Sequence, residues 1–266
     1  MPIFVDSEIK VLDEDAFHEF AHQVMGIIFS AHNECSRLIE EAPFKNVIQR
    51  RCEAAGISPV RREVQIVVTH KNFSKRYYMD LLLGCALMVE AKTVERLNET
   101  HLAQSLHYLM LAGMQHGLLV NLRNPRVEKR FVSTSLDADA RRDYEIVDGR
   151  WKEVDAASRR LRRTFEDLLA DWGAFLNLAL YREALGHLLN GPQTTLRRVP
   201  IFDGDRQIGM HDVFLLSKDS ILALTAVITG IDEMRQQLER FLNHTRMRCI
   251  QWINMHHHQI AFETIR

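Results

Sequence analysis

The chain has 266 residues, of which 46% are hydrophobic and 26% charged, so it can form one large or two medium domains. Its 34 basic and 35 acidic residues give a formal net charge of -1, and this balance gives no support to tight, non-specific nucleic-acid binding. The 4 cysteines have no C-x-x-C spacing, which argues against a disulfide framework and against a cysteine zinc site.

The N-terminal stretch MPIFVDSEIKVLDED is acidic and lacks the basic start and apolar core of a signal peptide. The longest apolar runs, such as ILALTAVITGI, are too short to span a bilayer. Together with the scattered cysteines, these features predict a soluble cytoplasmic protein that is not associated with a membrane.

The first half of the chain predicts the element order helix, three strands, helix, strand. Apolar residues at helical spacing predict a helix over residues 14–55, interrupted at Pro43. The following helix should begin after Asn98 as its N-cap and end near Gly113. Runs of β-branched, aromatic and apolar residues predict the four strands, at residues 62–70, 76–83, 86–94 and 117–122.

The second half repeats this order. Helices are expected at 162–190 and 231–244, and strands at 194–202, 206–216, 220–228 and 248–254. Some residues also recur at a fixed separation: Gln104, Tyr108 and Asn121 precede Gln237, Phe241 and Asn254 by 133 positions, and Asp80 precedes Asp212 by 132. A shared offset across several elements predicts an internal duplication, with domains at residues 1–145 and 146–266.

Acidic and basic residues interrupt the apolar strands of the first half at one place. Side chains alternate across a strand, so Glu90 and Lys92 should share one face while Ala91 points to the other. If Gly84-Cys85-Ala86 is a three-residue hairpin loop, Asp80 lies directly opposite Glu90 on that face. Two carboxylates and one ammonium group would then meet.

This combination of charges favours one kind of chemistry. Adjacent carboxylates repel each other and raise each other's pKa, and a divalent cation with a preference for oxygen ligands removes that cost. Mg²⁺, or Mn²⁺ in its place, could polarise a phosphoryl oxygen and lower the pKa of a bound water. Lys92 could orient that water or stabilise charge developing on phosphate. The pattern therefore indicates phosphodiester hydrolysis.

Asp80 followed by Glu90-x-Lys92 on consecutive strands resembles the PD-(D/E)XK nuclease superfamily, and within it the bacterial GxxExxY family, over residues 17–131. The resemblance implies an α/β fold with two tandem nuclease-like units, each a mixed β-sheet flanked by α-helices. It also implies a nucleic-acid substrate, with DNA expected. Gln104-x-x-x-Tyr108 is similar to a signature of several superfamily exonucleases, and its spacing places both side chains on one helical face as a supporting pair.

The resemblance also implies a third acidic ligand from the first helix. The family's Gly, Glu and Tyr positions fall on Leu38, Glu41 and Phe44, so the glutamate alone is retained. Pro43 bends or ends the helix at this point, which leaves Glu40 as an alternative to Glu41. The expected metal ligands are thus Glu41, Asp80 and Glu90. The expected catalytic residues are Asp80, Glu90, Lys92, Gln104 and Tyr108.

The second copy has lost most of these groups. Aligned by the family pattern, Glu90 corresponds to Ala223, Lys92 to Thr225 and the helix acid to Leu178, whereas Asp212 remains. One carboxylate without a lysine cannot hold Mg²⁺ tightly. We therefore expect a catalytically dead second half that forms an internal pseudo-dimer with the first.

Two alternatives remain open at this point. In the first, the chain keeps the nuclease fold as a non-catalytic nucleic-acid-binding or scaffold protein, with Lys92 simply paired to Glu90. The segment HEFAH, residues 18–22, also matches the H-E-x-x-H pattern of zinc peptidases, with Glu40 or Glu41 as a third ligand. A zinc site would leave the Glu90-x-Lys92 pattern unexplained.

Overall fold

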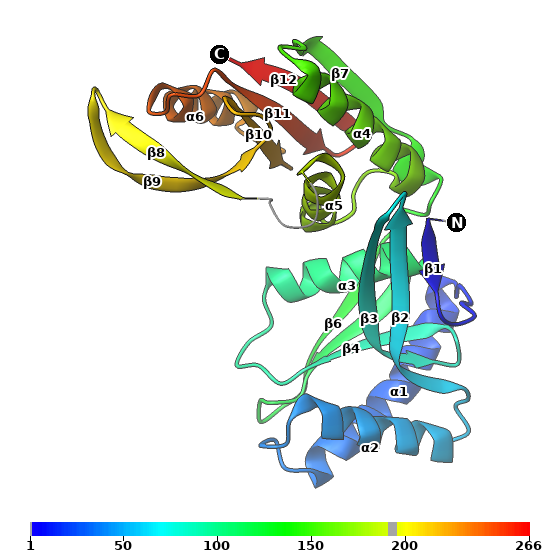
Figure 1. Cartoon of the computed structure of the whole chain (residues 1–266). Helices are drawn as coiled ribbons and strands as arrows, with labels where there is room; N and C mark the ends of the chain where they lie inside the picture. The colour runs from blue at the N-terminus through cyan, green and yellow to red at the C-terminus, as the bar shows by residue number, and fades with distance from the viewer. Residues whose placement is uncertain (1, 191–195) are drawn as a thin grey trace. The chain divides into compact units, whose positions relative to one another are not determined.

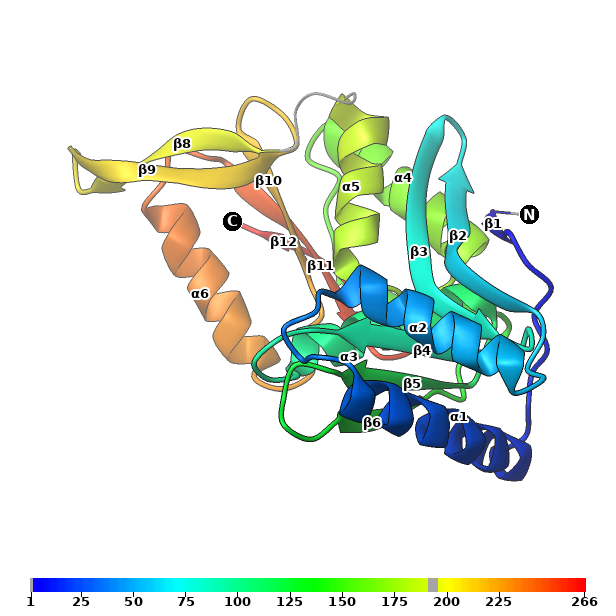
Figure 2. The same cartoon turned by 90° about the horizontal axis from the view of Figure 1, so that it is seen from below.

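The computed structural model describes residues 2–190 and 196–266 (Figure 1, Figure 2). The strand expected at 194–202 therefore begins with two residues, Thr194 and Thr195, that lie outside the described residues. Within the described ranges, none of the helices is both long enough and apolar enough to cross a membrane.

The chain forms two compact units. The first comprises the residues through Thr69 together with Ser74–Ala138, and the second comprises His70–Phe73 together with Asp139–Arg266. The elements of the first unit are β1 (Ile3–Val5), α1 (Glu14–Glu34), α2 (Glu41–Ala54), β2 (Val60–His70), β3 (Phe73–Leu83), β4 (Leu87–Lys92), α3 (Glu99–Ala112), β5 (His116–Asn121) and β6 (Glu128–Ser133). The short helix η1 (Ala140–Arg142) opens the second unit, followed by β7 (Glu145–Arg150), α4 (Ala156–Trp172), α5 (Leu178–Asn190), β8 (Arg197–Asp203), β9 (Arg206–Leu215), β10 (Ser220–Thr225), α6 (Ile231–Asn243), β11 (Cys249–His256) and β12 (Gln259–Ile265).

The first unit contains a six-stranded mixed sheet of order β1-β2-β3-β4-β5-β6. β4 pairs with β3 antiparallel and with β5 parallel, because α3 provides the crossover between β4 and β5. Apolar side chains of α1 and α2 cover one face of the sheet, which includes Leu81, Val89 and Ala91. By strand alternation, Asp80, Glu90 and Lys92 belong to the opposite face.

The expected single helix over residues 14–55 is instead two helices, and the role expected for Pro43 is wrong. α1 ends at Glu34, and α2 begins at Glu41 after a short irregular segment. Pro43 lies in the first turn of α2, where a missing N–H group breaks no intrahelical hydrogen bond. The proline therefore starts a helix here and does not end one.

The remaining helix of the first unit forms as expected. Asn98 caps α3 by accepting a hydrogen bond from the His101 N–H group at 3.1 Å. Gly113 ends the helix in the left-handed conformation, with φ of 69°, which glycine adopts without steric cost. These two ends fix the register of α3 and thereby the position of Gln104 and Tyr108.

The second unit has the same succession of elements as the first: two helices, three strands, a helix and two strands. Its sheet has the order β7-β12-β11-β10-β9-β8, with β10 antiparallel to β9 and parallel to β11. Each sheet has one further strand, which precedes the two helices in the chain, and its place in the sheet differs. In the first unit β1 pairs with β2, whereas in the second β7 pairs with β12. Both units are thus mixed α/β structures with the same strand pairing around the central parallel pair.

The offset of 133 residues also holds in the strand registers. Lys92 of β4 pairs with Asn121 of β5, and Thr225 of β10 pairs with Asn254 of β11. Each of these asparagines bonds the backbone of a valine that follows the strand, namely Val94 and Val227. The matching residues of the central parallel strands therefore occupy equivalent places in the two sheets. Asp212 does not, because Phe214↔Leu222 corresponds to Leu81↔Val89 and places Val213, not Asp212, at the position of Asp80.

Four strands have no counterpart among the sequence predictions: β1, β6, β7 and β12. β1 is only three residues long. β6 and β7 carry few buried side chains, because both are edge strands with charged and polar residues. The period-2 apolar signal is weak in such strands, since neither of their faces needs to be apolar.

β8 and β9 form a two-stranded arm that extends beyond the rest of the second unit's sheet (Figure 1, Figure 2). They pair with each other from Arg197↔Val213 to Asp203↔Arg206. β9 pairs with β10 only at Leu215↔Ile221 and Phe214↔Leu222. One edge of β10 is consequently not paired with β9 beyond Leu222.

The helix expected at 162–190 is divided at Gly173, which ends α4 with φ of 76°. A Cβ atom at this position would lie 2.7 Å from the backbone oxygen of Arg141. We expect Gly173→Ala to destabilise the second unit by on the order of 2–3 kcal/mol, because it adds both a strained backbone conformation and a steric overlap.

Urea denaturation would measure this loss. Gly149→Ala is the matched control, because an added Cβ at Gly149 meets no atom within 4 Å and its backbone lies outside the left-handed region. Equal stability changes for the two variants would contradict the role assigned to Gly173.

Candidate functional site

The hairpin between β3 and β4 brings Asp80 opposite Glu90, as expected from the sequence. Leu81 pairs with Val89 and Leu83 with Leu87, which leaves residues 84–86 as the loop. Gly84 and Cys85 both adopt positive φ angles, 58° and 62°, and so reverse the chain within three residues. The loop length thereby sets the register of the acidic pair.

Asp80 and Glu90 are in contact and both are buried, with 6% and 1% of their surface exposed. The Asp80 carboxylate accepts a hydrogen bond from the Ala91 N–H group at 2.9 Å. The Glu90 carboxylate lies 3.5 Å from the backbone nitrogen of Asp80. Each acid is therefore held by the other's strand.

Burial and the neighbouring charge of Asp80 raise the pKa of Glu90 to about 7. The ammonium group of Lys92 acts in the opposite direction. A carboxylate pair buried at this depth is costly, and it persists in a fold only where cations and hydrogen bonds compensate for the lost water.

Lys92 supplies one of these cations. Its Nζ donates to Oε1 of Glu90 at 2.7 Å and lies 3.8 Å from Oδ2 of Asp80. Burial lowers the pKa of Lys92, but the charge of Glu90 and its hydrogen bond outweigh this effect, so that the net pKa is raised. The lysine therefore stays protonated beside the two carboxylates.

A second lysine, Lys45 of α2, enters the same cluster and was not anticipated from the sequence. Its Nζ donates to Oδ1 of Asp80 at 2.8 Å and forms a further short hydrogen bond with Glu63 of β2. Burial lowers the pKa of Lys45, yet its bonds to Asp80 and Glu63 raise it above its ordinary value. Lys45 is thus a permanent cation with only 6% of its surface exposed.

The expected third acid, Glu41, lies one helical turn before Lys45, and its carboxylate is 3.4 Å from the Lys45 ammonium group. Glu41 is partly buried, whereas Glu40 is exposed and precedes the helix as its N-cap. The structure thus brings Glu41, and not Glu40, toward Asp80, with the Lys45 ammonium group in contact with both.

Glu63 reaches Lys45 from an unusual backbone conformation. Its φ of 50° within β2 is in the left-handed region, which costs a non-glycine residue about 1–3 kcal/mol. The cluster as a whole contains the carboxylates of Glu41, Glu63, Asp80 and Glu90 and the ammonium groups of Lys45 and Lys92. Carboxylates therefore outnumber cations, and the cluster retains an affinity for additional positive charge.

Gln104 and Tyr108 lie together on α3, as their spacing predicts. The Gln104 side-chain amide donates to the Tyr108 hydroxyl at 2.9 Å. Burial raises the pKa of Tyr108, and the charges of Glu90, Lys92 and Asp80 also act on it. The tyrosine is therefore adjacent to the acidic cluster.

Asn121 holds the segment that follows Lys92. Its side-chain amide donates to the Val94 carbonyl at 2.8 Å and accepts from the Val94 N–H group at 3.1 Å. We expect Asn121→Ala to cost about 2 kcal/mol, because it leaves two part-buried backbone groups without partners. Chemical denaturation would measure the loss, with exposed Asn46→Ala as the control.

Asn254→Ala should cost a similar amount in the second unit, because Asn254 makes the same pair of bonds to Val227 at 2.9 and 2.8 Å. A loss no larger than that of Asn46→Ala in either case would contradict this assignment.

Within residues 2–190 and 196–266, no group of three or more His, Cys, Asp or Glu side chains is already arranged to hold a metal ion. This holds for the acidic cluster, where Lys45 is bonded to the carboxylates, and also for the H-E-x-x-H segment. His18, Glu19 and His22 are on the exposed face of α1, opposite Phe17 and Ala21. The zinc-peptidase alternative thus gains no third ligand from the described part of the chain.

The corresponding positions of the second unit contain different side chains. Ala223 and Thr225 take the places of Glu90 and Lys92 in the strand register. Asp212 is on the arm, where it pairs with Arg198 at 3.4 Å and is half-exposed. A second acidic cluster is therefore not formed by these residues.

Comparison with known proteins supports the nuclease resemblance of the first unit. The family model described as the PD-(D/E)XK nuclease superfamily matches residues 18–132. No curated protein and no solved structure gives a significant match to the chain. The matched segment contains Glu41, Asp80, Glu90, Lys92, Gln104 and Tyr108, together with the unanticipated Lys45 and Glu63.

Proposed function

We propose that the first unit is a metal-dependent nuclease that hydrolyses phosphodiester bonds of nucleic acid, with DNA as the expected substrate. The observation that carries this proposal is the buried contact between Asp80 and Glu90, next to Lys92, on two adjacent strands. Burying two like charges is expensive for stability alone, and perturbed carboxylates of this kind are concentrated at functional sites.

The side chains present are suited to a divalent cation such as Mg²⁺ or Mn²⁺. Asp80 and Glu90 supply hard oxygen ligands, and Glu41 would join them if the Lys45 ammonium group moved aside. Such a cation supplies Lewis acidity and lowers the pKa of a bound water. The uncompensated negative charge of the cluster is the electrostatic basis for this assignment.

Lys92 is assigned the role of orienting the attacking water or stabilising negative charge on phosphate. It is the least buried member of the central trio, with 13% of its side chain exposed against 8% for Asp80 and 1% for Glu90. Its bond to Glu90 fixes the ammonium group in place before a substrate arrives, so little reorganisation is needed during the reaction.

Gln104 and Tyr108 are assigned a supporting role. Their mutual hydrogen bond orders both side chains on one face of α3. The charges of Glu90 and Lys92 affect the pKa of Tyr108, so the tyrosine lies close to both. Gln104 and Tyr108 are therefore positioned to contact either the lysine or a nucleic-acid strand.

We further propose that residues 146–266 are a degenerate copy of the first unit that packs with it as an internal pseudo-dimer. The shared element order and the common register offset support a duplication. The replacement of Glu90 and Lys92 by Ala223 and Thr225 supports the loss of catalysis.

A non-catalytic binding or scaffold role is the second candidate, and one observation favours it. The Lys45 ammonium group already bonds Asp80 and Glu63, so the cluster has an internal cation without any metal. In that case the acidic cluster would only stabilise the fold.

Cleavage assays separate these candidates. We expect the intact chain to cleave labelled DNA or RNA, single- or double-stranded, with Mg²⁺ or Mn²⁺ and not with EDTA. Asp80→Asn should abolish cleavage, because it removes a central carboxylate. The matched control is Asp212→Asn, which makes the same change at an acid on β9 of the second unit and should leave activity unchanged. Cleavage that persists in Asp80→Asn, or no cleavage of any substrate, would contradict the proposal.

A further inference from the structure

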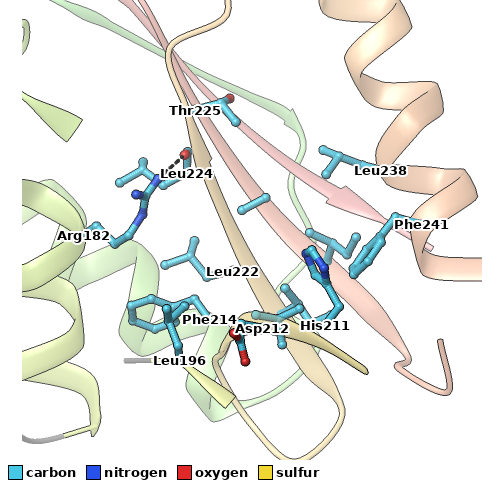
Figure 3. Close-up of a pocket in the computed structure, with 14 residues that line it drawn as sticks. Arg182, Leu196, His211, Asp212, Phe214, Leu222, Leu224, Thr225, Leu238 and Phe241 are labelled. Carbon is cyan, nitrogen blue, oxygen red and sulfur yellow. Dashed lines mark hydrogen bonds between the residues drawn. The ribbon is translucent and has the colours of Figure 1, made fainter. Parts of the chain in front are cut away.

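A pocket of about 370 Å³ lies in the second unit, at the place that corresponds to the acidic cluster of the first (Figure 3). Ala223 and Thr225, at the positions of Glu90 and Lys92, both line it. Phe241, which is separated from Tyr108 by the common offset, lines it as well. Its volume falls within the roughly 300–1,000 Å³ of small-molecule sites.

The pocket is open for two structural reasons. Small side chains have replaced the long charged ones, since alanine and threonine stand where Glu90 and Lys92 fill the first unit. In addition, the pairing of β9 with β10 stops at Leu222, so that the edge of β10 from Ala223 to Thr225 is not covered by β9.

The walls of the pocket are mainly apolar and include aromatic rings. Leu222, Leu224 and Phe214 contribute aliphatic and aromatic carbon atoms. On the opposite side the rings of His211 and Phe241 lie close together (Figure 3), with centroids 5.2 Å apart and planes at 65°. Ring faces of this kind favour a planar aromatic partner over a flexible aliphatic chain.

One cationic group with no acidic partner reaches the pocket. Arg182 of α5 donates to the Leu224 carbonyl at 3.3 Å (Figure 3), and it forms no ion pair with any residue in the described ranges. The one acid among the lining residues, Asp212, is paired with Arg198. The pocket therefore presents an uncompensated guanidinium group, which binds carboxylate and phosphate groups strongly.

We propose that this pocket binds a planar aromatic molecule that carries one carboxylate or phosphate group. The aromatic body contacts His211, Phe241 and the leucines, and the anionic group bonds Arg182. The proposal concerns the second unit alone and does not depend on nuclease activity in the first.

Calorimetric titration of the intact chain tests it with three probes: adenosine monophosphate as an aromatic phosphate, indole-3-acetate as an aromatic carboxylate, and decanoate as an aliphatic carboxylate. We expect saturable binding of one of the aromatic anions, and whichever binds identifies the anionic group. Arg182→Met should weaken this binding by on the order of tenfold or more, because it removes the guanidinium group and keeps the aliphatic stem. Ala223→Leu should also weaken it by filling the pocket.

Two control variants show which site the ligand occupies. Arg163→Met makes the same change at an exposed position of α4 outside the pocket and should bind like the unmodified chain. Asp80→Asn should also bind like the unmodified chain, because it alters only the first unit.

The proposal is overturned if neither aromatic anion binds, if decanoate binds as tightly as they do, or if Arg182→Met leaves the affinity unchanged. Loss of binding in Asp80→Asn would overturn it too, because the ligand would then occupy the first unit. Arg182 has an exposed side chain, so Arg182→Met keeps the test valid if Ala223→Leu fails to fold.

Discussion

Replacing Lys92 with methionine should reduce kcat/KM for metal-dependent cleavage by about 10²–10³-fold, as expected for the loss of a positioned charge in a largely buried site. The methionine keeps most of the lysine stem, so the packing around this side chain should change little. Burial and Asp80 already raise the pKa of Glu90 to about 7, so this glutamate can take up a proton when its ammonium partner is removed. The variant should therefore fold, and its defect should be chemical.

Lys129→Met is the matched control, because Lys129 is an exposed lysine of β6 in the same unit. It should retain full activity. The two variants are compared by their single-turnover cleavage rates. Far-ultraviolet circular dichroism confirms that both are folded. If Lys92→Met cleaves as fast as Lys129→Met, Lys92 has no part in the reaction.

Replacing Lys45 with methionine should destabilise the metal-free protein by about 3 kcal/mol, because it leaves Asp80 buried without its main cation. For a unit of this size, that loss corresponds to a fall in Tm on the order of 10 °C. Mg²⁺ should recover more stability in this variant than in the unmodified chain, because the metal no longer competes with an ammonium group for the same carboxylates.

Differential scanning calorimetry with and without Mg²⁺ measures both effects. Lys10→Met, at an exposed position of the first unit, should show neither the loss nor the enhanced recovery. An equal Mg²⁺-dependent shift in Lys45→Met and in the unmodified chain would mean that Lys45 does not occupy the metal position.

The central part of the site was predictable from the sequence because it depends on local rules. The loop at residues 84–86 fixes the hairpin register, and strand alternation places Glu90 and Lys92 on one face. The α3 pair follows from helical spacing and from the caps at Asn98 and Gly113. Each of these inferences uses residues that are close in sequence.

Lys45 could not be found in this way, because its partners come from other elements. Glu63 and Asp80 lie 18 and 35 residues away, and their approach depends on tertiary packing. One signal was present in the sequence: Lys45 follows Phe44 and precedes Ile48 on the apolar face of α2. A lysine on a buried helical face requires an anionic partner.

Helix boundaries were the least predictable part of the fold. Pro43 was expected to interrupt a helix, yet it is in the first turn of one. The break at Gly173 depends on the close approach of Arg141, which the sequence pattern does not reveal. Edge strands β6 and β7 were missed because their side chains do not alternate between apolar and polar.

The duplication, the pseudo-dimer and the GxxExxY assignment remain predictions. The most specific support for the duplication is Asn121 and Asn254, which make the same two backbone bonds at the same offset. Each asparagine fixes the backbone of the segment that follows a central strand. This structural role explains why the asparagines would be retained after Glu90 and Lys92 had been replaced in the second unit.

Calorimetric titration of Mn²⁺ into the intact chain and into Glu90→Gln tests most directly whether the acidic cluster is a metal site. The unmodified chain should show saturable binding, and Glu90→Gln should weaken it by at least about tenfold, because the substitution removes a charged ligand and leaves the shape of the side chain unchanged. Absence of saturable binding to the folded chain, or equal affinity in the two proteins, would contradict the account and favour a cluster neutralised by Lys45 and Lys92 alone.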